Sequence, residues 1–302
     1  SVSYYRNFLY SYMLEGRSVV EQTLNISLEE KQYLLDSLLI NYEPQNRAYL
    51  YDFFLDNCAT RIRDIFDQAI PREIIYHYQH LEEGQSFRDL IAPYIKHLPW
   101  TRLGINLGLG LPSDRVATPW DYMFIPDYMM YVYQAAEISN GNISDPLAGD
   151  PVTLLEGTNY HESHCPNYPF WVFILVMLAV FAVTYYTKRG VISSRWSKWV
   201  DRILFGAVGL LGSLIAFLWF GTDHNVTILN LNILWAHPFH LIFILLPCSI
   251  APLVQRYYLM VSSVFLLFTL VAWPFLPQSM PWHIYPLVIA LTFRYIYLWS
   301  SK

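Results

Sequence analysis

The second half of the chain is strongly apolar and has almost no acidic side chains. Residues 169–302 contain 2 acidic and 8 basic residues, whereas residues 1–168 contain 22 and 11. Five apolar segments in this half are each long enough, at about 20 residues, to cross a hydrocarbon core. They are Pro169–Thr187, Ile203–Gly221, Leu229–Cys248, Tyr257–Phe275 and Trp282–Ser300. This pattern predicts that residues 169–302 form an all-α membrane domain of about five transmembrane helices.

The basic residues predict the orientation of this domain. They gather in the first connection between apolar segments and recur at Arg256 and Lys302. The second and fourth connections contain no Lys or Arg. Because cytoplasmic loops carry the excess of Lys and Arg, we expect the first and third connections and the C-terminus in the cytoplasm. The N-terminal domain then lies outside, in a periplasm or an equivalent space.

Residues 1–168 have the composition of a water-facing domain. Their 22 acidic and 11 basic residues leave an acidic balance, which argues against nucleic acid as a partner. Ser27 and Glu30 have the spacing of a capping box before an apolar run, which predicts a helix start. The chain begins at Ser1 without an initiator Met or a signal peptide, although this domain must cross the membrane. We therefore expect a further segment upstream.

A single cysteine stands where a helix is expected to begin. Asp56 and Asn57 are good N-cap residues. A cysteine in the first helical turn meets unpaired backbone N–H groups and the positive end of the helix dipole, and both favour the thiolate over the thiol. Arg61 and Arg63 add positive charge nearby. The segment therefore has the features of a prepared sulfur nucleophile.

Cys58 has two other interpretations. It shares an apolar helical stripe with Ile62 and Ile65. The pattern therefore fits equally well with Cys58 as a small buried hydrophobic residue. A disulfide with Cys165 is the third interpretation. The chain has 3 cysteines, which cannot form a disulfide framework.

Two further groups of polar residues have a ligand or metal interpretation. Residues His161–Cys165 form an H-x-x-H-C cluster, which we interpret as part of a solvated linker because a metal site needs a fourth ligand. His224, Asn230, Asn232 and His237 lie at the outer side of the membrane domain. Polar groups at that depth need partners, so they predict a pocket for a headgroup or substrate. Hydrogen bonding between helices is the alternative.

Two other features are expected to be structural. The glycines within Gly104–Gly110 fit neither the dinucleotide nor the P-loop spacing, and they favour a closely packed or bent backbone. Arg294 lies inside the last apolar segment, and we expect its side chain to snorkel toward the cytoplasmic interface.

The cysteine segment resembles the signature of a known family. Residues Tyr51–Asp64 are similar to the signature of the Lnb-type proteins of Bacteroidetes, which are lipoprotein N-acyltransferases. Supporting segments are Glu15–Arg17, Asn25–Glu30, Gly104–Asp114, Phe124–Pro126 and the group His224, Asn230 and Asn232. The resemblance covers most of the chain. It implies that residues 1–168 form an α+β, papain-like periplasmic domain of the circularly permuted NlpC type, incomplete at its N-terminus.

The resemblance also implies a covalent route of acyl transfer. Cys58 would take a fatty acyl chain from a phospholipid as a thioester, and the α-amino group of a diacylated lipoprotein cysteine would then accept it as an amide. Asn57 and Thr60 would support the site and its oxyanion, together with backbone N–H groups. In such folds the catalytic histidine precedes the cysteine, but the first histidine here is His77. We expect the histidine upstream of this chain.

The remaining implied roles concern phosphate and location. Arg61 or Arg63 would contact a phosphate, unless they pair with Asp64 or Asp67 inside the fold. The polar group of His224, Asn230, Asn232 and His237 would bind substrate. The protein would lie in the inner membrane of a bacterium, with no metal and no cofactor.

Two other functions remain open at this point. A membrane-anchored cysteine peptidase or amidase acting on cell-wall peptides would use the same nucleophile with water as the acceptor, in a water-open groove. A non-catalytic membrane scaffold would have Cys58 buried or disulfide-bonded. The cysteine motif argues against the scaffold, and the apolar segments argue mildly against the peptidase.

Overall fold

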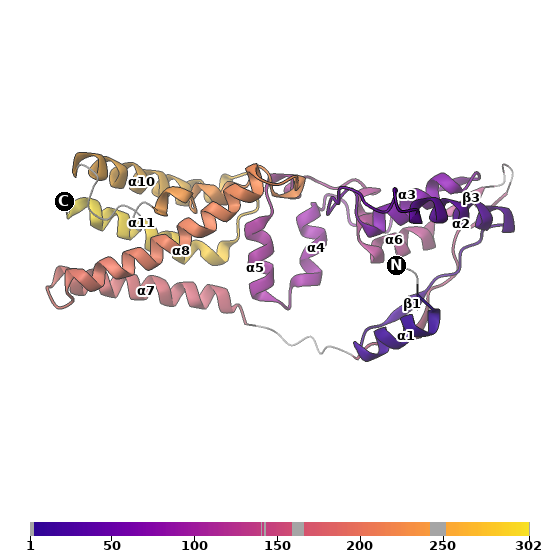
Figure 1. Cartoon of the computed structure of the whole chain (residues 1–302), viewed down its shortest axis with the longest axis horizontal. Coiled ribbons are helices and arrows are strands. Elements are labelled where there is room, and N and C mark those ends of the chain that lie inside the picture. Colours follow the sequence, from indigo (N-terminus) through magenta and orange to yellow (C-terminus); the bar gives the residue numbers. More distant parts are fainter. Residues whose placement is uncertain (1–2, 140, 142, 159–165, 242–251, 302) are drawn as a thin grey trace. The chain divides into compact units, whose positions relative to one another are not determined.

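The structure is a computed structural model that describes residues 3–139, 141, 143–158, 166–241 and 252–301. The chain divides into two units (Figure 1). The first unit consists of Ser1–Leu90 and Val116–Ser163, and the second of Ile91–Arg115 and His164–Lys302. The second unit therefore contains residues 91–115, which the sequence analysis assigns to the water-facing domain.

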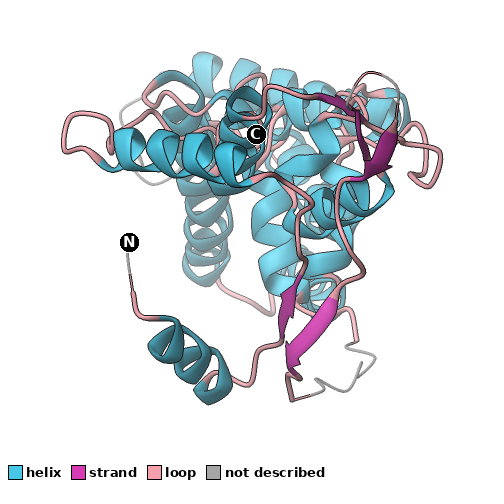
Figure 2. Cartoon of the chain, turned by 90° about the vertical axis from the view of Figure 1, so that its right-hand side faces the viewer, coloured by secondary structure: helices cyan, strands magenta, loops and turns pink. Residues whose placement is uncertain are grey.

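The first unit combines helices with two small antiparallel sheets (Figure 2). Strand β1 pairs with β5, and β2, β3 and β4 form a three-stranded sheet in that order. The elements are α1 Tyr5–Leu14, β1 Val19–Glu21, α2 Leu28–Tyr42, α3 Cys58–Ala69, β2 Glu73–Ile75, α4 Phe87–Ile95 (which continues into the second unit), η2 Asp121–Phe124, α6 Pro126–Ala135, β3 Glu137–Ser139, β4 Ser144–Pro146 and β5 Val152–Leu155. These short strands agree with a mixed α and β domain, while the papain-like arrangement remains a prediction.

The core of the first unit forms against one face of α3. Phe66 of α3 and Ile70, the residue after α3, pack with Met123 of η2, Val132 of α6 and Ile138 of β3. All five side chains are buried. Because these residues come from separate parts of the chain, their burial holds the start of α3 in a defined place.

The start of α2 confirms the predicted capping box. The Ser27 hydroxyl accepts a hydrogen bond from the Glu30 backbone N–H at 3.2 Å, and the Glu30 carboxylate accepts one from the Ser27 N–H at 2.7 Å. The same carboxylate accepts two hydrogen bonds of 2.6 Å from Arg72, just before β2. These bonds to Arg72 are the main cause of the lowered pKa of Glu30.

The second unit is a bundle of long apolar helices joined by short 3-10 segments. Its elements are α5 Pro99–Gly108, η1 Leu111–Asp114, α7 Tyr168–Lys188, α8 Ser194–Phe220, η3 Asn225–Thr227, η4 Leu231–Leu234, η5 Pro238–Leu241, α10 Pro252–Ala272, η6 Trp273–Phe275, η7 Trp282–Ile284 and α11 Tyr285–Ser300. Helix α11 packs against both α7 and α10. Its side chains are largely buried, as expected for a helix at the centre of a bundle.

Among the described residues, three helices are long and apolar enough to cross a membrane: Tyr168–Lys188, Ser194–Phe220 and Arg256–Phe275. They correspond to the first, second and fourth predicted spans. The fifth predicted span contains α11, which has 16 residues. The third, Leu229–Cys248, begins in the 3-10 segments η4 and η5 and then continues beyond the described residues. Five spans therefore remain a prediction.

The prediction of a closely packed backbone is confirmed at Gly110. A Cβ atom at this position would overlap the carbonyl oxygen of Ile228. The Gly110 N–H donates to the carbonyl oxygen of Val226 at 2.8 Å. Glycine allows this approach of two backbones, which joins the segment after α5 to the segment after α8.

Arg294 does not snorkel, and that prediction was wrong. Its side chain is fully buried and donates to both carboxylate oxygens of Asp201 on α8, at 2.5 and 3.1 Å. It also donates to Thr184 Oγ1 on α7 at 2.8 Å and to the Ser197 hydroxyl on α8. A buried guanidinium needs an opposite charge and several acceptors, and here they come from two neighbouring helices. The residue therefore joins α7, α8 and α11.

This buried pair predicts a large loss of stability when one partner is removed. Replacing Asp201→Asn leaves Arg294 charged and without its carboxylate, and should reduce the free energy of unfolding by about 3–5 kcal/mol. Thermal unfolding of the detergent-purified protein measures the effect. Asp223→Asn is the control, because Asp223 is the other acid of residues 169–302 and is exposed. Equal melting temperatures for the two variants would contradict the assigned role.

The Glu30–Arg72 pair predicts a pH dependence of stability. The pKa of Glu30 lies below its reference value of 4.5 in the folded protein. Its contribution is therefore fully present above pH 4.5 and is lost as the pH falls below that value. Glu30→Gln should lower the melting temperature at pH 7, and this difference from the unmodified protein should shrink in acid. Glu29→Gln, at an exposed neighbouring position, should show neither effect.

Candidate active site

A tight turn leads the chain into the cysteine helix. Asp52 and Asp56 exchange two backbone hydrogen bonds of 3.1 Å. The Asp52 side chain accepts from the backbone N–H groups of Phe54 and Leu55, at 3.0 and 2.9 Å. The carboxylate thereby satisfies the donors inside the turn. The turn places Asn57 and Cys58 at the beginning of α3.

Asn57 is the N-cap of α3, as predicted. Its side-chain oxygen accepts from the N–H groups of Ala59 and Thr60 at 2.8 and 2.9 Å, and the Thr60 hydroxyl accepts from the Asn57 N–H at 2.8 Å. The Asn57 amide nitrogen donates to the carbonyl oxygens of Phe53 and Phe124, at 3.1 and 3.0 Å. Both amide hydrogens are thus used inside the fold. The predicted oxyanion role of Asn57 gains no support from these contacts, whereas a supporting role for Asn57 and Thr60 agrees with them.

Cys58 is the first residue of α3, and it is exposed and free. Within the described part of the chain, its Sγ forms no hydrogen bond and its backbone N–H has no acceptor. The buried-core interpretation is wrong, because the buried face of α3 carries Ala59, Arg63 and Phe66 instead. Ile62, one turn after Cys58, is 56% exposed. Cys58 and Ile62 therefore lie on the outer face of the helix.

Exposed apolar side chains flank the thiol on both sides in sequence. The group consists of Leu50, Tyr51, Phe53, Leu55 and Ile62, and we call it the apolar rim. Leu50 is the most exposed of them, at 71%. Burial, followed by the electrostatic interaction with Cys58, raises the pKa of the Tyr51 phenol. Exposed apolar side chains grouped in this way are typical of a surface that binds a ligand or a membrane.

Both arginines of the motif already have partners in the fold. Arg61 forms a two-point ion pair with Asp56, at 2.6 and 2.8 Å, and its guanidinium lies 3.5 Å from the ring centre of Tyr49. Arg63 is buried, binds Asp64 at 2.7 Å and donates to the carbonyl oxygen of Trp120 at 3.0 Å. The structure therefore favours the alternative of pairing within the fold over the phosphate contact.

The predicted outer polar group lies in the second unit, where two of its members bind the end of α5. The Asn230 amide donates to the carbonyl oxygens of Leu107 and Gly108 at 2.8 and 3.1 Å. Asn232 is fully buried and donates to the carbonyl oxygen of Asn106 at 3.3 Å. The last carbonyls of a helix have no partner inside it, and these amides supply one. Both asparagines are therefore engaged in structural bonds.

The other two members of this group are histidines in different surroundings. His224 is exposed and precedes η3. The ring of His237 stacks on that of His240 at 3.8 Å, and its Nδ1 is buried and has no hydrogen-bond partner in the described residues. His240 binds the Tyr295 hydroxyl at 2.7 Å and the Trp235 carbonyl oxygen at 2.9 Å. A substrate role for His224 and His237 stays a prediction.

Several residues of these networks were missed in the sequence analysis. Gln278 donates to Asn230 Oδ1 at 3.3 Å and accepts from the Leu231 N–H at 2.7 Å. Trp120 covers the Arg63 guanidinium at 4.4 Å. No short motif connects such distant positions, so their partners appear only in the folded chain.

The metal and disulfide interpretations involve positions beyond the described part. The described residues contain no group of three His, Cys, Asp or Glu side chains that could hold a metal ion. The cluster at 161–165 and Cys248 lie outside the described residues.

The hydrogen bonds of Asn57 predict how substitutions there will act. Asn57→Ala removes the cap and should cost about 1–2 kcal/mol. Asn57→Asp keeps a capping oxygen but cannot donate to Phe53 and Phe124. If the donated bonds fix the turn, Asn57→Asp will also lower the melting temperature and will change the rate at which maleimide modifies Cys58. A fully stable Asn57→Asp variant would indicate that capping alone explains the role of Asn57.

Comparison with known families assigns both parts of the chain. Residues 1–84, which include Cys58, match the family model described as the Lnb N-terminal periplasmic domain. Residues 161–302 match the model described as the Lnb transmembrane domain. Neither a curated protein nor a solved structure matches the chain. Because the two models together cover about three quarters of its length, the chain belongs to the Lnb family of membrane proteins, with a periplasmic N-terminal domain followed by a transmembrane domain.

Proposed function

We propose that this protein is a lipoprotein N-acyltransferase with Cys58 as its nucleophile. The observation that carries the proposal is the exposed, free Cys58 thiol at the start of α3, flanked by the apolar rim. A phospholipid donor has an apolar acyl chain and an electrophilic ester carbonyl. Its binding site therefore needs an apolar surface and a nucleophile. The family match supports a role in lipoprotein maturation.

In the first half of the proposed reaction, Cys58 accepts an acyl chain from a phospholipid. The thiolate sulfur bonds to the ester carbonyl carbon, and the bond between that carbon and the glycerol oxygen breaks. The glycerol oxygen takes up the proton that the Cys58 thiol released and leaves as part of a lysophospholipid, and the acyl chain remains on Cys58 as a thioester. The apolar rim would hold the chain by removing its surface from water.

In the second half, the acyl chain moves to the lipoprotein. The α-amino nitrogen of the diacylated N-terminal cysteine bonds to the thioester carbon, and the carbon–sulfur bond breaks. One proton leaves the nitrogen and one returns to the sulfur, so the thiol is regenerated. The product is an amide, which is more stable than the thioester.

The structure supports one specific donor for the oxyanion formed in both halves. The Cys58 backbone N–H points from the first turn of α3 and has no acceptor among the described residues. The Ala59 and Thr60 N–H groups are already bound by Asn57. We therefore assign the oxyanion contact to the Cys58 N–H and a positioning role to Asn57 and Thr60.

The membrane position of the protein is part of the same proposal. The chain would cross a bacterial inner membrane five times, with the C-terminus in the cytoplasm and the Cys58 domain in the periplasm. This arrangement would give both lipid substrates lateral access. The cysteine peptidase alternative uses the same nucleophile, but the apolar rim favours an acyl chain over a hydrophilic cell-wall peptide.

Mass spectrometry of the intact protein tests the covalent step. Enzyme purified from membranes should carry an acyl adduct on Cys58 that neutral hydroxylamine releases and that Cys58→Ala lacks. Diacylated lipopeptide with a free α-amino group should discharge the adduct, whereas the same lipopeptide with an acetylated amine should not. Absence of an adduct, or discharge by water alone at the same rate, would argue against the transferase.

The apolar rim predicts a variant that separates lipid binding from thiol chemistry. Ile62→Glu places a charge beside the sulfur and should reduce acyl loading at least tenfold while leaving the thiol accessible to a small maleimide. Gln68→Glu introduces the same charge at an exposed position farther along α3 and serves as the control. Equal loading of both variants would contradict the role of the rim.

A further inference from the structure

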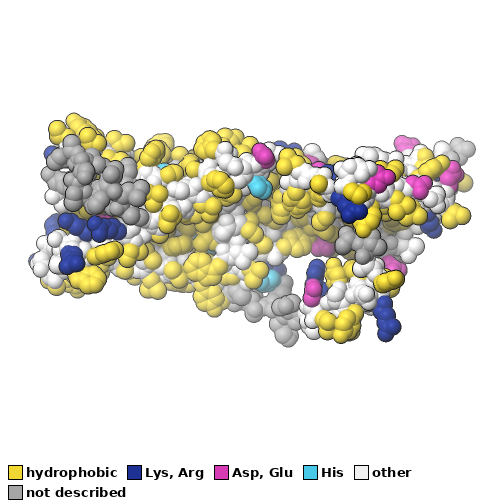
Figure 3. Space-filling model, viewed as in Figure 1, with side chains coloured by type: hydrophobic (Ala, Val, Ile, Leu, Met, Phe, Trp, Pro, Cys, Tyr) yellow, Lys and Arg dark blue, Asp and Glu magenta, His cyan; other side chains and the backbone are white. Residues whose placement is uncertain are grey.

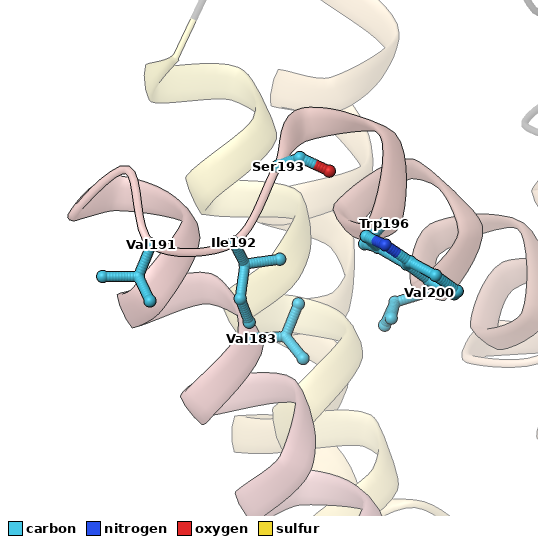
Figure 4. A pocket seen from close by; sticks show the side chains of 6 residues that line it. All are labelled: Val183, Val191, Ile192, Ser193, Trp196 and Val200. Carbon is cyan, nitrogen blue, oxygen red and sulfur yellow. The ribbon is translucent and has the colours of Figure 1, made fainter.

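A pocket lies in the second unit where α7 turns into α8 (Figure 4). It has a volume of about 540 Å³ and is lined by Val183, Val191, Ile192, Ser193, Trp196 and Val200. Four valine and isoleucine side chains and the Trp196 indole make its lining apolar, while Ser193 contributes a hydroxyl. The volume falls in the range of sites that bind small ligands.

Five basic residues lie close in sequence to this pocket. They are Lys188, Arg189, Arg195, Lys198 and Arg202, and Figure 3 shows Lys and Arg gathered at this end of the unit. None of the five forms an ion pair within the described residues. The nearest acid in sequence, Asp201, is buried and bound to Arg294. No acid of the described residues therefore neutralises this positive charge by an ion pair.

The exposed aromatic side chains indicate the level of the pocket in a membrane. Trp196 and Trp199 are both exposed, and the guanidinium of Arg202 lies 5.2 Å from the ring centre of Trp199. Tryptophan and basic residues together are typical of the boundary between hydrocarbon and water. A ligand at this boundary can place an apolar part in the pocket and an anionic part among the cations.

We propose that this pocket binds an anionic phospholipid, with an acyl chain against Trp196 and the phosphate among the basic residues. The occupant is a lipid because the lining is apolar. It is anionic because none of the nearby cations forms an ion pair within the described residues, although Arg189 and Arg202 lie over aromatic rings. The positive-inside rule assigns this end to the cytoplasmic leaflet, which presents anionic lipids. This site is separate from the acyl-donor site proposed at Cys58, and its existence does not depend on acyl transfer.

Lipid binding to the full chain in detergent tests the proposal, using native mass spectrometry with phosphatidylglycerol and phosphatidylcholine of equal chain length. The Cys58→Ala background prevents covalent loading, so the result is independent of the proposed reaction. Phosphatidylglycerol should bind more tightly than phosphatidylcholine. Arg195→Gln, which changes the basic residue next to Trp196 in sequence, should weaken phosphatidylglycerol binding by about fivefold.

Two matched controls define the site. Trp196→Ala changes a lining residue and should weaken phosphatidylglycerol binding. Its control is Trp199→Ala, which changes an exposed tryptophan outside the lining and should leave binding unchanged. Arg256→Gln removes an exposed basic residue at the start of α10 and should leave the affinity unchanged. All these positions are exposed, and unchanged melting temperatures confirm folding.

Three results would overturn the proposal. Equal affinity for phosphatidylglycerol and phosphatidylcholine would show that the site does not select a negatively charged lipid. Unchanged phosphatidylglycerol binding in Trp196→Ala would place the lipid elsewhere. Displacement of the lipid by glycerol phosphate at similar concentration would indicate a simple anion site.

Discussion

The unpaired polar groups at helix ends organise much of this protein. An α-helix leaves its first N–H groups and its last carbonyls without internal partners. At α3, Asn57 takes two of these N–H groups, and that of Cys58 has no acceptor among the described residues. At α5, Asn230 and Asn232 take the last carbonyls. The need to satisfy helix ends thus places Cys58 at the start of α3 and binds the end of α5 to Asn230 and Asn232.

Charge inside the membrane domain obeys a related requirement. Arg294 is fully buried in an apolar bundle, where an isolated guanidinium would be very unfavourable. Asp201 on α8 and Thr184 on α7 complete its hydrogen bonds. Such a network contributes less net stability than its short distances imply, because both charges lost their hydration. We expect the network to favour this register of the three helices, because a shift of one helix would separate Arg294 from Asp201 or Thr184.

Arginine and asparagine side chains that the sequence pattern favoured as ligands form structural bonds within the fold. Arg63 fits the chemistry of a phosphate ligand, but its guanidinium is buried under Trp120 and serves the fold. Five basic residues that form no ion pair within the described residues lie near the turn between α7 and α8, close in sequence to an apolar pocket. The exposure of Cys58 and the apolar rim, in contrast, keeps the candidate nucleophile available for a lipid substrate. Burial and existing partners thus separate structural polar residues from those free to bind.

The sequence by itself determined the features that depend on neighbours a few residues apart. The caps at Ser27 and Asn57 act over three residues, and apolar runs of about 20 residues mark the membrane helices. The position of Cys58 at a helix start followed from the same local rules, whereas the mixed α and β character was implied by the family resemblance. Only the tertiary structure decided which face of α3 is buried, where Arg63 and Arg294 find their partners, and that residues 91–115 join the second unit. These outcomes depend on contacts between residues far apart in the chain, such as Arg294 and Asp201, and local spacing carries no information about such contacts.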